Sequence, residues 1–218
     1  MIQRVYLQAK KAKKLSKVIV ATDDIRIFNH VQSFGGEVIM TNSQHQSGTD
    51  RCAEAANNFQ DMEAIINIQG DEPFINPNQI DQLCEILQQN LALNIVTLAK
   101  KITSPEQIFS PNTVKVVFNQ KMIAQYFSRS PIPFLRGIET KDWLQKGTFY
   151  KHIGLYGYRK HTLLKITKLP LSNLEKAESL EQLRWLENGY KIGLGLTKLE
   201  TIGIDTPADL EKIKTFIN

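Results

Sequence analysis

Cysteines and long apolar runs are scarce in this 218-residue sequence. Cys52 and Cys84 show no C-x-x-C spacing and no His-rich neighbourhood, which argues against a disulfide framework and a zinc site and suits a reducing compartment. The apolar runs, such as residues 18–21 and 38–40, are far shorter than the ~20 residues a membrane span needs. The first residues lack the apolar stretch of a signal peptide. We therefore expect a cytoplasmic protein without membrane insertion.

The positive charge is confined to one end of the chain. Residues 1–17 carry six cations and no acid, whereas the remainder holds 21 basic and 22 acidic residues. A nucleic-acid surface would need a basic patch with aromatic residues interleaved among the cations, and this segment has one aromatic residue, Tyr6. Lysines near the end of a first helix, where they favour its dipole, explain the pattern better. We therefore expect no nucleic-acid partner.

Hydrophobic periodicity in the first half alternates between helix and strand. Buried strands are expected at residues 17–22, 38–40, 64–68 and 94–99. Helices are expected at the N-terminus, from Ile25 to a C-cap at Gly35-Gly36, from Thr49, and from Pro77. This alternation predicts a mostly parallel sheet with helices on both faces.

The second half is less regular. Paired strands are expected at residues 114–118 and 123–127, a long loop at 128–147, and further strands at 152–158 and 191–197. Ser172 and Glu175 have capping-box spacing before a helix expected to end near Gly189. Thr206-Pro207 begins the last expected helix. The length favours one domain over residues 1–218.

Two acidic segments are candidates for a metal site. Asp71 and Glu72 follow an expected strand, and Asp205 precedes an expected helix. Ligands of open α/β sheets bind beyond the carboxyl ends of the strands, and Mg²⁺ takes one or two carboxylates together with phosphate oxygens. A solvated turn at Asp71 and a helix cap at Asp205 are the alternatives.

A second group of residues suits a polyhydroxylated acid. His152 and Tyr156 lie four positions apart on an expected strand and share a face. Arg129 ends another strand and suits a carboxylate, while Glu181 and Gln182 lie on a helix and suit hydroxyls. Each of these residues, taken alone, also fits a structural role.

Nine segments, in this order, carry a resemblance. They are VATDD at 20–24, GGEVIMT at 35–41, HQSGTDR at 45–51, NIQGDEP at 67–73, PNTVKVV at 111–117, YFSRSPIPF at 126–134, HIGLYGYR at 152–159, LEQLRWLENG at 180–189 and GIDTPADL at 203–210. Together they closely resemble the bacterial 3-deoxy-manno-octulosonate (Kdo) cytidylyltransferase family across essentially the whole chain.

The resemblance implies a fold and a reaction. The fold would be an α/β nucleotide-binding three-layer sandwich of the nucleotide-diphospho-sugar transferase type, with a small β-rich dimerisation subdomain. Residues 1–110 would form the nucleotide-binding half, and residues 111–218 the sugar-acid and dimerisation half. The family works as a homodimer and uses Mg²⁺ to couple CTP to Kdo, which releases CMP-Kdo and pyrophosphate for lipopolysaccharide assembly.

The resemblance also assigns roles to residues. Asp71 and Asp205 match the metal-binding, catalytic aspartates. The residues around cytosine and ribose would be Ser47, Gly48, Thr49, Arg51 and Gln69. The sugar-acid pocket would be lined by Arg129, His152, Tyr156, Glu181 and Gln182.

One family feature has no counterpart in this sequence. Family members begin with a strand and a phosphate-gripping loop of the form R-x-x-S-x-R-x-P-G-K, whereas residues 1–5 resemble the helix that follows it. Without that strand, we expect an apolar slot or unpaired backbone groups between residues 18–22 and 64–68. Without that loop, we expect a chain of low activity and marginal stability.

Two other functions fit parts of the sequence. One is a cytidylyltransferase for another sugar acid, such as a sialic acid, although HIGLYGYR and LEQLR favour Kdo. The other is an inactive protein that retains nucleotide or sugar binding, which the absent loop supports. An assay with both sugar acids distinguishes the first alternative from a Kdo enzyme. Calorimetry with CTP and with Kdo distinguishes the second, because an inactive protein would bind a substrate without turning it over.

Overall fold

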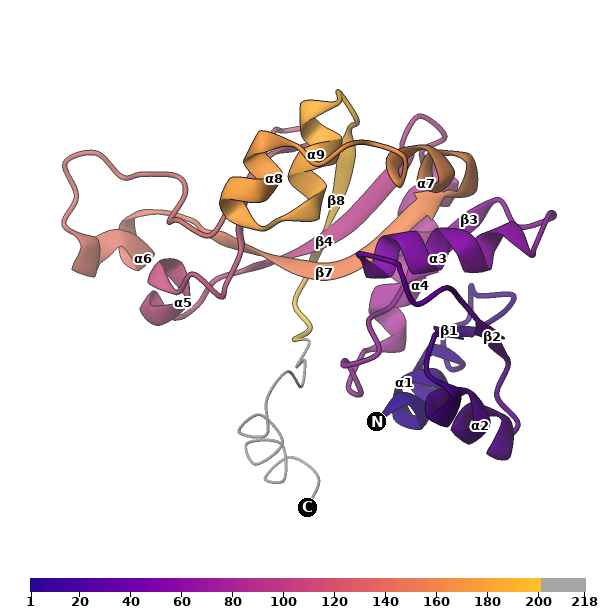
Figure 1. Ribbon diagram of the computed structural model, residues 1–218. Coiled ribbons are helices and arrows are strands. Elements are labelled where there is room, and N and C mark those ends of the chain that lie inside the picture. The colour runs from indigo at the N-terminus through magenta and orange to yellow at the C-terminus, as the bar shows by residue number, and fades with distance from the viewer. Residues whose placement is uncertain (201–218) are drawn as a thin grey trace, which may run out of the picture.

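A computed structural model describes residues 1–200 of the chain (Figure 1). The helices are α1 (Ile2–Ala9), α2 (Ile25–Ser33), α3 (Gly48–Asn57), α4 (Pro77–Gln89), α5 (Pro105–Phe109), the 3-10 helix η1 (Thr140–Asp142), α6 (Trp143–Lys146), α7 (Lys160–Ile166), α8 (Asn173–Glu178) and α9 (Glu181–Glu187). The strands are β1 (Val20–Thr22), β2 (Val38–Met40), β3 (Ala64–Asn67), β4 (Ile95–Lys101), β5 (Lys115–Phe118), β6 (Ala124–Ser128), β7 (Tyr150–Arg159) and β8 (Ile192–Thr197).

The described strands form two sheets, and the larger one is mixed rather than mostly parallel. Six strands form it in the order β6-β5-β7-β4-β8, with β3 also paired to β7, while β1 and β2 form a separate parallel pair. Strand β7 is antiparallel to β3, β4 and β5, and only β4 and β8 pair in parallel there. Strands β3, β4 and β8 therefore share one direction, and the long β7 runs against them.

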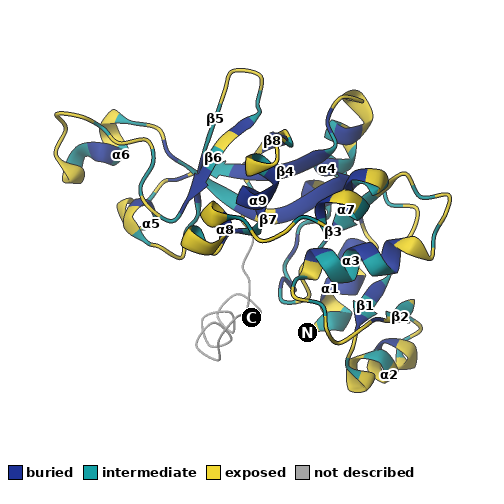
Figure 2. Cartoon of the chain, turned by 45° about the horizontal axis from the view of Figure 1, so that its top comes forward, coloured by how far each residue is buried: buried dark blue, intermediate teal, exposed yellow. Residues whose placement is uncertain are grey.

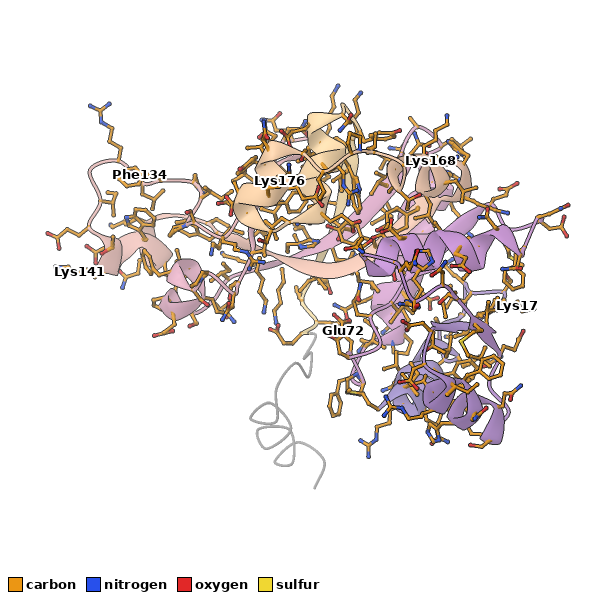
Figure 3. The ribbon with its side chains drawn as sticks, viewed as in Figure 1. Lys17, Glu72, Phe134, Lys141, Lys168 and Lys176 are labelled. Atoms are coloured by element: carbon orange, nitrogen blue, oxygen red, sulfur yellow. The ribbon has the colours of Figure 1, made fainter. Side chains whose placement is uncertain are left out.

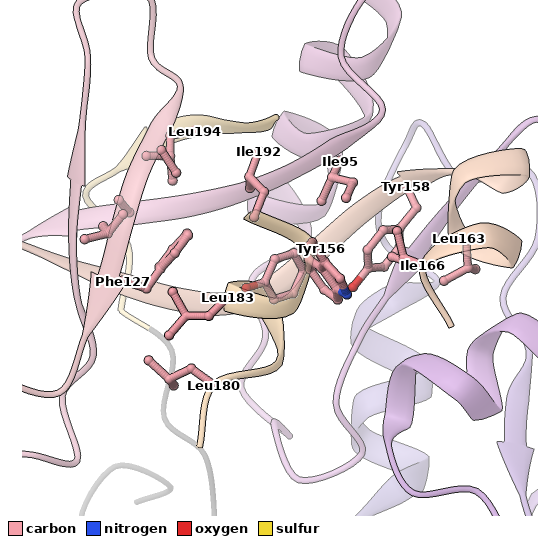
Figure 4. Close-up of a cluster of buried hydrophobic side chains, with 14 of the residues drawn as sticks. Ile95, Phe127, Tyr156, Tyr158, Leu163, Ile166, Leu180, Leu183, Ile192 and Leu194 are labelled. Carbon is pink, nitrogen blue, oxygen red and sulfur yellow. The ribbon is translucent and has the colours of Figure 1, made fainter. Parts of the chain in front are cut away.

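Helices cover both faces of the large sheet and create two cores. On one face, α3, α7 and α9 pack on Ile95, Tyr156 and Tyr158 (Figure 4). On the other face, α1 and α4 pack on Val96 and Leu155. Figure 2 shows the buried residues along the sheet and the exposed residues on the outer surfaces of the helices. The three-layer α/β arrangement expected from the sequence is confirmed.

Local sequence signals explain where several elements begin and end. Helix α4 has Pro77 in its first turn and an N-cap at Asn76, whose side chain accepts a hydrogen bond from the Asn78 amide. Ser172 and Glu175 form the predicted capping box of α8. That helix ends at Ser179, which has a left-handed backbone (φ 52°), and α9 begins anew at Glu181. The single helix expected up to Gly189 is therefore two helices.

A cavity of about 660 Å³ separates the two sheets. Its walls include residues 14–21 on one side, 61–70 on the other, and side chains from α1, α3 and α4. A cavity is therefore present where a slot was expected, but its lining mixes apolar residues such as Val18 and Ile66 with charged ones such as Lys17 and Arg159.

An arm extends from the sheet beyond β6. Residues 129–149 leave the hairpin of β5 and β6, pass through η1 and α6, and return to β7 (Figure 1). Trp143 anchors this arm: its ring stacks on Phe149 with centroids 5.8 Å apart, and Phe134 meets it edge-on. Phe134 is itself 74% exposed, so the arm presents an aromatic residue to the surface.

No helix among residues 1–200 is both long enough and apolar enough to cross a membrane.

Candidate active site

The candidate nucleotide residues gather where α3 begins. Ser47 is the N-cap of α3, and its hydroxyl accepts a hydrogen bond from the Asp50 amide at 3.1 Å. Gly48 faces the side chain of Gln69, which follows β3: a Cβ atom on Gly48 would lie 3.5 Å from Gln69 Oε1. The amino end of this helix thus approaches the loop after β3, and the helix dipole favours negative charge there.

Thr49 connects this group to α9. The sequence predicts a helix cap at Thr49, but Ser47 is the cap, and Thr49 Oγ1 instead donates to Glu181 Oε2 at 2.5 Å. Arg184 donates to the other carboxylate oxygen of Glu181 at 3.1 Å. Burial raises the pKa of the Glu181 carboxyl, and hydrogen bonds from Thr49 and Ser47 act against that shift. The nucleotide and sugar-acid candidates therefore meet at one carboxylate.

Arg51 points toward the small sheet. Its Nη1 donates to Thr41 Oγ1 at 2.6 Å and lies 3.2 Å from Asp23 Oδ1. Thr41 follows β2 and Asp23 follows β1, so Arg51 joins α3 to the carboxyl ends of both strands. Gly48, Arg51 and Gln69 all line the cavity between the sheets.

His152 and Tyr156 lie together on β7. Their ring centroids are 5.2 Å apart, and His152 Nε2 lies 3.0 Å from the hydroxyl of Thr97 on β4. Burial lowers the pKa of His152 from the ordinary 6.5 to about 3, so the imidazole is neutral at physiological pH. Tyr156 is 8% exposed, and its ring also packs against Trp185 of α9. Strand β7 and α9 thus bring His152, Tyr156 and the Glu181 helix together.

Arg129 lies at the end of β6, where backbone carbonyls accept hydrogen bonds from its guanidinium. Nε donates to Glu178 O at 2.7 Å, Nη1 to Pro111 O at 2.9 Å and Nη2 to Ser179 O at 3.3 Å. The side chain is therefore held against the junction of α8 and α9, just before Glu181.

Of the two aspartates predicted as metal ligands, the structure describes Asp71 but not Asp205. Asp71 is half-buried in the loop after β3, and its neighbour Glu72 lies in that loop in Figure 3. Asp205 lies outside the described residues, so its distance from Asp71 stays a prediction. Within residues 1–200, no three His, Cys, Asp or Glu side chains form a metal-binding group. One carboxylate nevertheless fits Mg²⁺ that is bound mainly through phosphate oxygens.

The sequence matches the protein family described as Cytidylyltransferase over residues 1–192. The 3-deoxy-manno-octulosonate cytidylyltransferase of Parabacteroides distasonis is 55% identical over 222 residues, covering 100% of this chain and 87% of that protein. The enzyme of that name from Thermodesulfovibrio yellowstonii is 50% identical, with 100% and 88% covered. The chain belongs to the 3-deoxy-manno-octulosonate cytidylyltransferase family.

A solved structure supports this membership. CMP:2-keto-3-deoxy-manno-octonic acid synthetase, determined in complex with CTP, superposes on this chain with a TM-score of 0.91. The two sequences are 42% identical, and the match covers 99% of this chain and 86% of that one. The cytidylyltransferase family and the α/β fold predicted from the nine segments are thus confirmed.

Two fully buried polar residues, Lys115 and Thr97, lie beside the candidate sugar-acid residues and were not predicted from the sequence to do so. Lys115 lies in the PNTVKVV segment and is fully buried. The sequence pattern that could have indicated this burial is a lysine between two valines of an expected strand. Thr97 is also fully buried, but nothing in a threonine within a strand indicates that it will contact His152.

The neutral state of His152 predicts a pH dependence of stability. The unfolded chain binds a proton at His152 below pH 6.5, whereas the folded protein does so only near pH 3. Acid therefore favours the unfolded state, by about 1.4 kcal/mol per pH unit below 6.5. Urea unfolding between pH 7 and 5 should show this slope, and His152→Gln should remove it. Equal slopes in the two proteins would contradict a buried neutral imidazole.

Proposed function

We propose that this protein transfers the cytidylyl group of CTP to Kdo, giving CMP-Kdo and pyrophosphate. The contact between Thr49 and Glu181 carries the proposal, because it joins the nucleotide and sugar-acid residues across 132 positions of sequence. Membership of the family and the likeness to a synthetase complexed with CTP support it.

The nucleotide half would use the loop before α3 and the end of β3. Ser47, Gly48, Thr49, Arg51 and Gln69 would hold cytosine and ribose. Gly48, Arg51 and Gln69 line one cavity, so a single ligand can reach all three. Gly48 and the Gln69 amide lie close together, since a Cβ atom on Gly48 would be in van der Waals contact with that amide.

The sugar half has polar groups available for hydroxyls. Within the described residues, Tyr156 Oη and Gln182 Nε2 are buried without a hydrogen-bond partner. Such donors are costly to bury unless a ligand or water satisfies them. Glu181 would accept from sugar hydroxyls, and His152 would act as a neutral donor or acceptor. Arg129 would attract the carboxylate of the sugar acid by its charge.

The reaction needs positioning rather than a covalent enzyme intermediate. The anomeric oxygen of Kdo attacks the α-phosphorus of CTP in line, the bond to the β-phosphate oxygen breaks, and pyrophosphate leaves while the hydroxyl proton passes to solvent. The residues around Thr49 and Glu181 would hold the two substrates side by side. Asp71, together with Asp205, would hold Mg²⁺, which when bound neutralises phosphate charge and acidifies the attacking hydroxyl.

We further infer a homodimer, a cytoplasmic location and a product used for lipopolysaccharide, as the family resemblance implies. The arm of residues 129–149 supports the dimer, because its exposed Phe134 suits a protein interface. Sedimentation of the protein, with Phe134→Ser as the interface variant, measures the oligomeric state.

The test of the proposed function is pyrophosphate release from CTP with Kdo or with a sialic acid. We expect release with Kdo and CTP together, and none when either substrate is omitted. Faster release with the sialic acid would assign a different sugar acid to the site. Calorimetric binding of Kdo or CTP without any turnover would instead support an inactive binding protein.

A further inference from the structure

Lys115 is a fully buried cation at the first residue of strand β5, whose other three residues are apolar. Its Nζ donates to three backbone carbonyls: Ser110 O at 2.8 Å, Thr113 O at 2.6 Å and Arg129 O at 2.5 Å. Burial lowers the pKa of Lys115, and the nearby carboxylate of Glu178 opposes that shift. A buried ammonium is costly unless its donors are satisfied, and here all three are used.

Glu178 and Arg129 extend this contact into a network. The Glu178 carboxylate accepts from Ser128 Oγ at 2.6 Å and from the Arg129 amide at 2.8 Å. Lys115 and Glu178 therefore both bind the backbone of Arg129. The ammonium of Lys115 binds its carbonyl, and the carboxylate of Glu178 binds its amide. The same Arg129 guanidinium holds the carbonyls of Glu178 and Ser179.

The network ends at the elements that carry the sugar-acid candidates. Ser179 is the left-handed residue at which α8 stops, two positions before Glu181. On the other side, the carbonyl of Val114, next to Lys115, accepts from the His152 amide at 2.8 Å. Lys115 thus lies between the backbone of β7 at His152 and the α8–α9 junction. None of the three carbonyls that Lys115 binds belongs to a candidate nucleotide residue.

We propose that Lys115 is a positioning residue for the sugar-acid half of the site, acting through Arg129 and Glu178 on the start of α9. This inference rests on the proposed function, since it uses the sugar-acid role of Glu181 and Arg129. Displacing a binding group by about 1 Å can cost on the order of 100-fold in rate. Loss of the ammonium should therefore weaken the sugar acid selectively.

The test compares Lys115→Met with Lys160→Met. Lys160 is a matched control, because its Nζ also donates to a backbone carbonyl, Phe59 O at 2.5 Å, but that carbonyl lies just after the C-terminal end of α3. Calorimetry would measure the dissociation constants of Kdo and CTP for each protein, and thermal unfolding would measure stability. We expect Lys115→Met to weaken Kdo about tenfold or more and to leave CTP unchanged, and Lys160→Met to change neither.

Three outcomes decide the matter. Loss of stability in Lys115→Met with unchanged Kdo binding would overturn the positioning role and leave Lys115 as a structural residue. If Lys115→Met does not fold, Glu178→Gln replaces it: weaker Kdo with unchanged CTP supports the proposal, and unchanged Kdo overturns it. Glu181→Gln tests the site itself, because unchanged Kdo binding there would remove the proposed sugar-acid site, independently of Lys115.

Discussion

Substitution of Asp71 by Asn is expected to lower kcat/KM by about 100- to 1,000-fold, the effect typical of losing one group that stabilises transition-state charge. Asp71 follows β3 beside Gln69, where the phosphates of a bound nucleotide would arrive. Asn keeps the size of the side chain but removes the charge that attracts a divalent cation. Pyrophosphate release over a range of Mg²⁺ concentrations measures the loss.

Asp61→Asn is the matched control for this substitution. Asp61 is exposed in the loop before β3, whereas Asp71 follows that strand. The same chemical change at Asp61 should leave activity and its Mg²⁺ dependence unaltered. Full activity of Asp71→Asn would show that this carboxylate does not hold the metal. Asp205 would then have to bind the metal with a different second ligand.

Substitution of Trp185 by Ala is expected to reduce the free energy of unfolding by about 3–5 kcal/mol, as for other large buried aromatic residues. Trp185 is 1% exposed and meets the rings of Tyr156 and Tyr158 edge-on. A domain is typically stable by about 5–15 kcal/mol, so the loss is a large share. Urea unfolding followed by circular dichroism measures it.

The Trp185 variant should also bind Kdo more weakly, because its ring supports Tyr156 within the sugar-acid group. Trp143→Ala is the comparison: this tryptophan is also buried, but within residues 1–200 its aromatic neighbours are Phe109, Phe134 and Phe149. It should lose stability and keep its affinity for Kdo. If both variants lost the same affinity for Kdo, the loss would not depend on the support of Tyr156, and the proposed role of Tyr156 in sugar-acid binding would be wrong.

The element types were predictable where one residue has a strong local preference. Pro77 marks the start of α4, and Ser172 with Glu175 marks the start of α8, since both signals act within one helical turn. The break at Ser179 was not predictable, because nothing in serine requires a left-handed backbone. Strand direction was missed for a related reason. Periodicity reports which faces are buried and not which way β7 runs between β3 and β4.

The candidate site was predictable as a set of segments and not as a set of contacts. The motifs named Thr49 and Glu181 separately, but only the packing of α9 against the start of α3 brings their side chains to 2.5 Å. Arg129 was assigned to the carboxylate of the sugar acid because of its charge alone. In the structure, the N–H groups of its guanidinium donate to backbone carbonyls at the α8–α9 junction. Long-range hydrogen bonds of this kind depend on the tertiary fold, which short motifs do not specify.

The cavity between the two sheets has a consequence for how the protein opens. Within residues 1–200, no strand pairing crosses it, so β1 and β2 contact the large sheet through helices and side chains. Segments joined by few hydrogen bonds can unfold at a lower free energy than the whole domain. Amide protons of β1 and β2 should therefore exchange with deuterium faster than those of β4. A nucleotide that contacts both Arg51 and Gln69 would bind the two sheets together and slow that exchange.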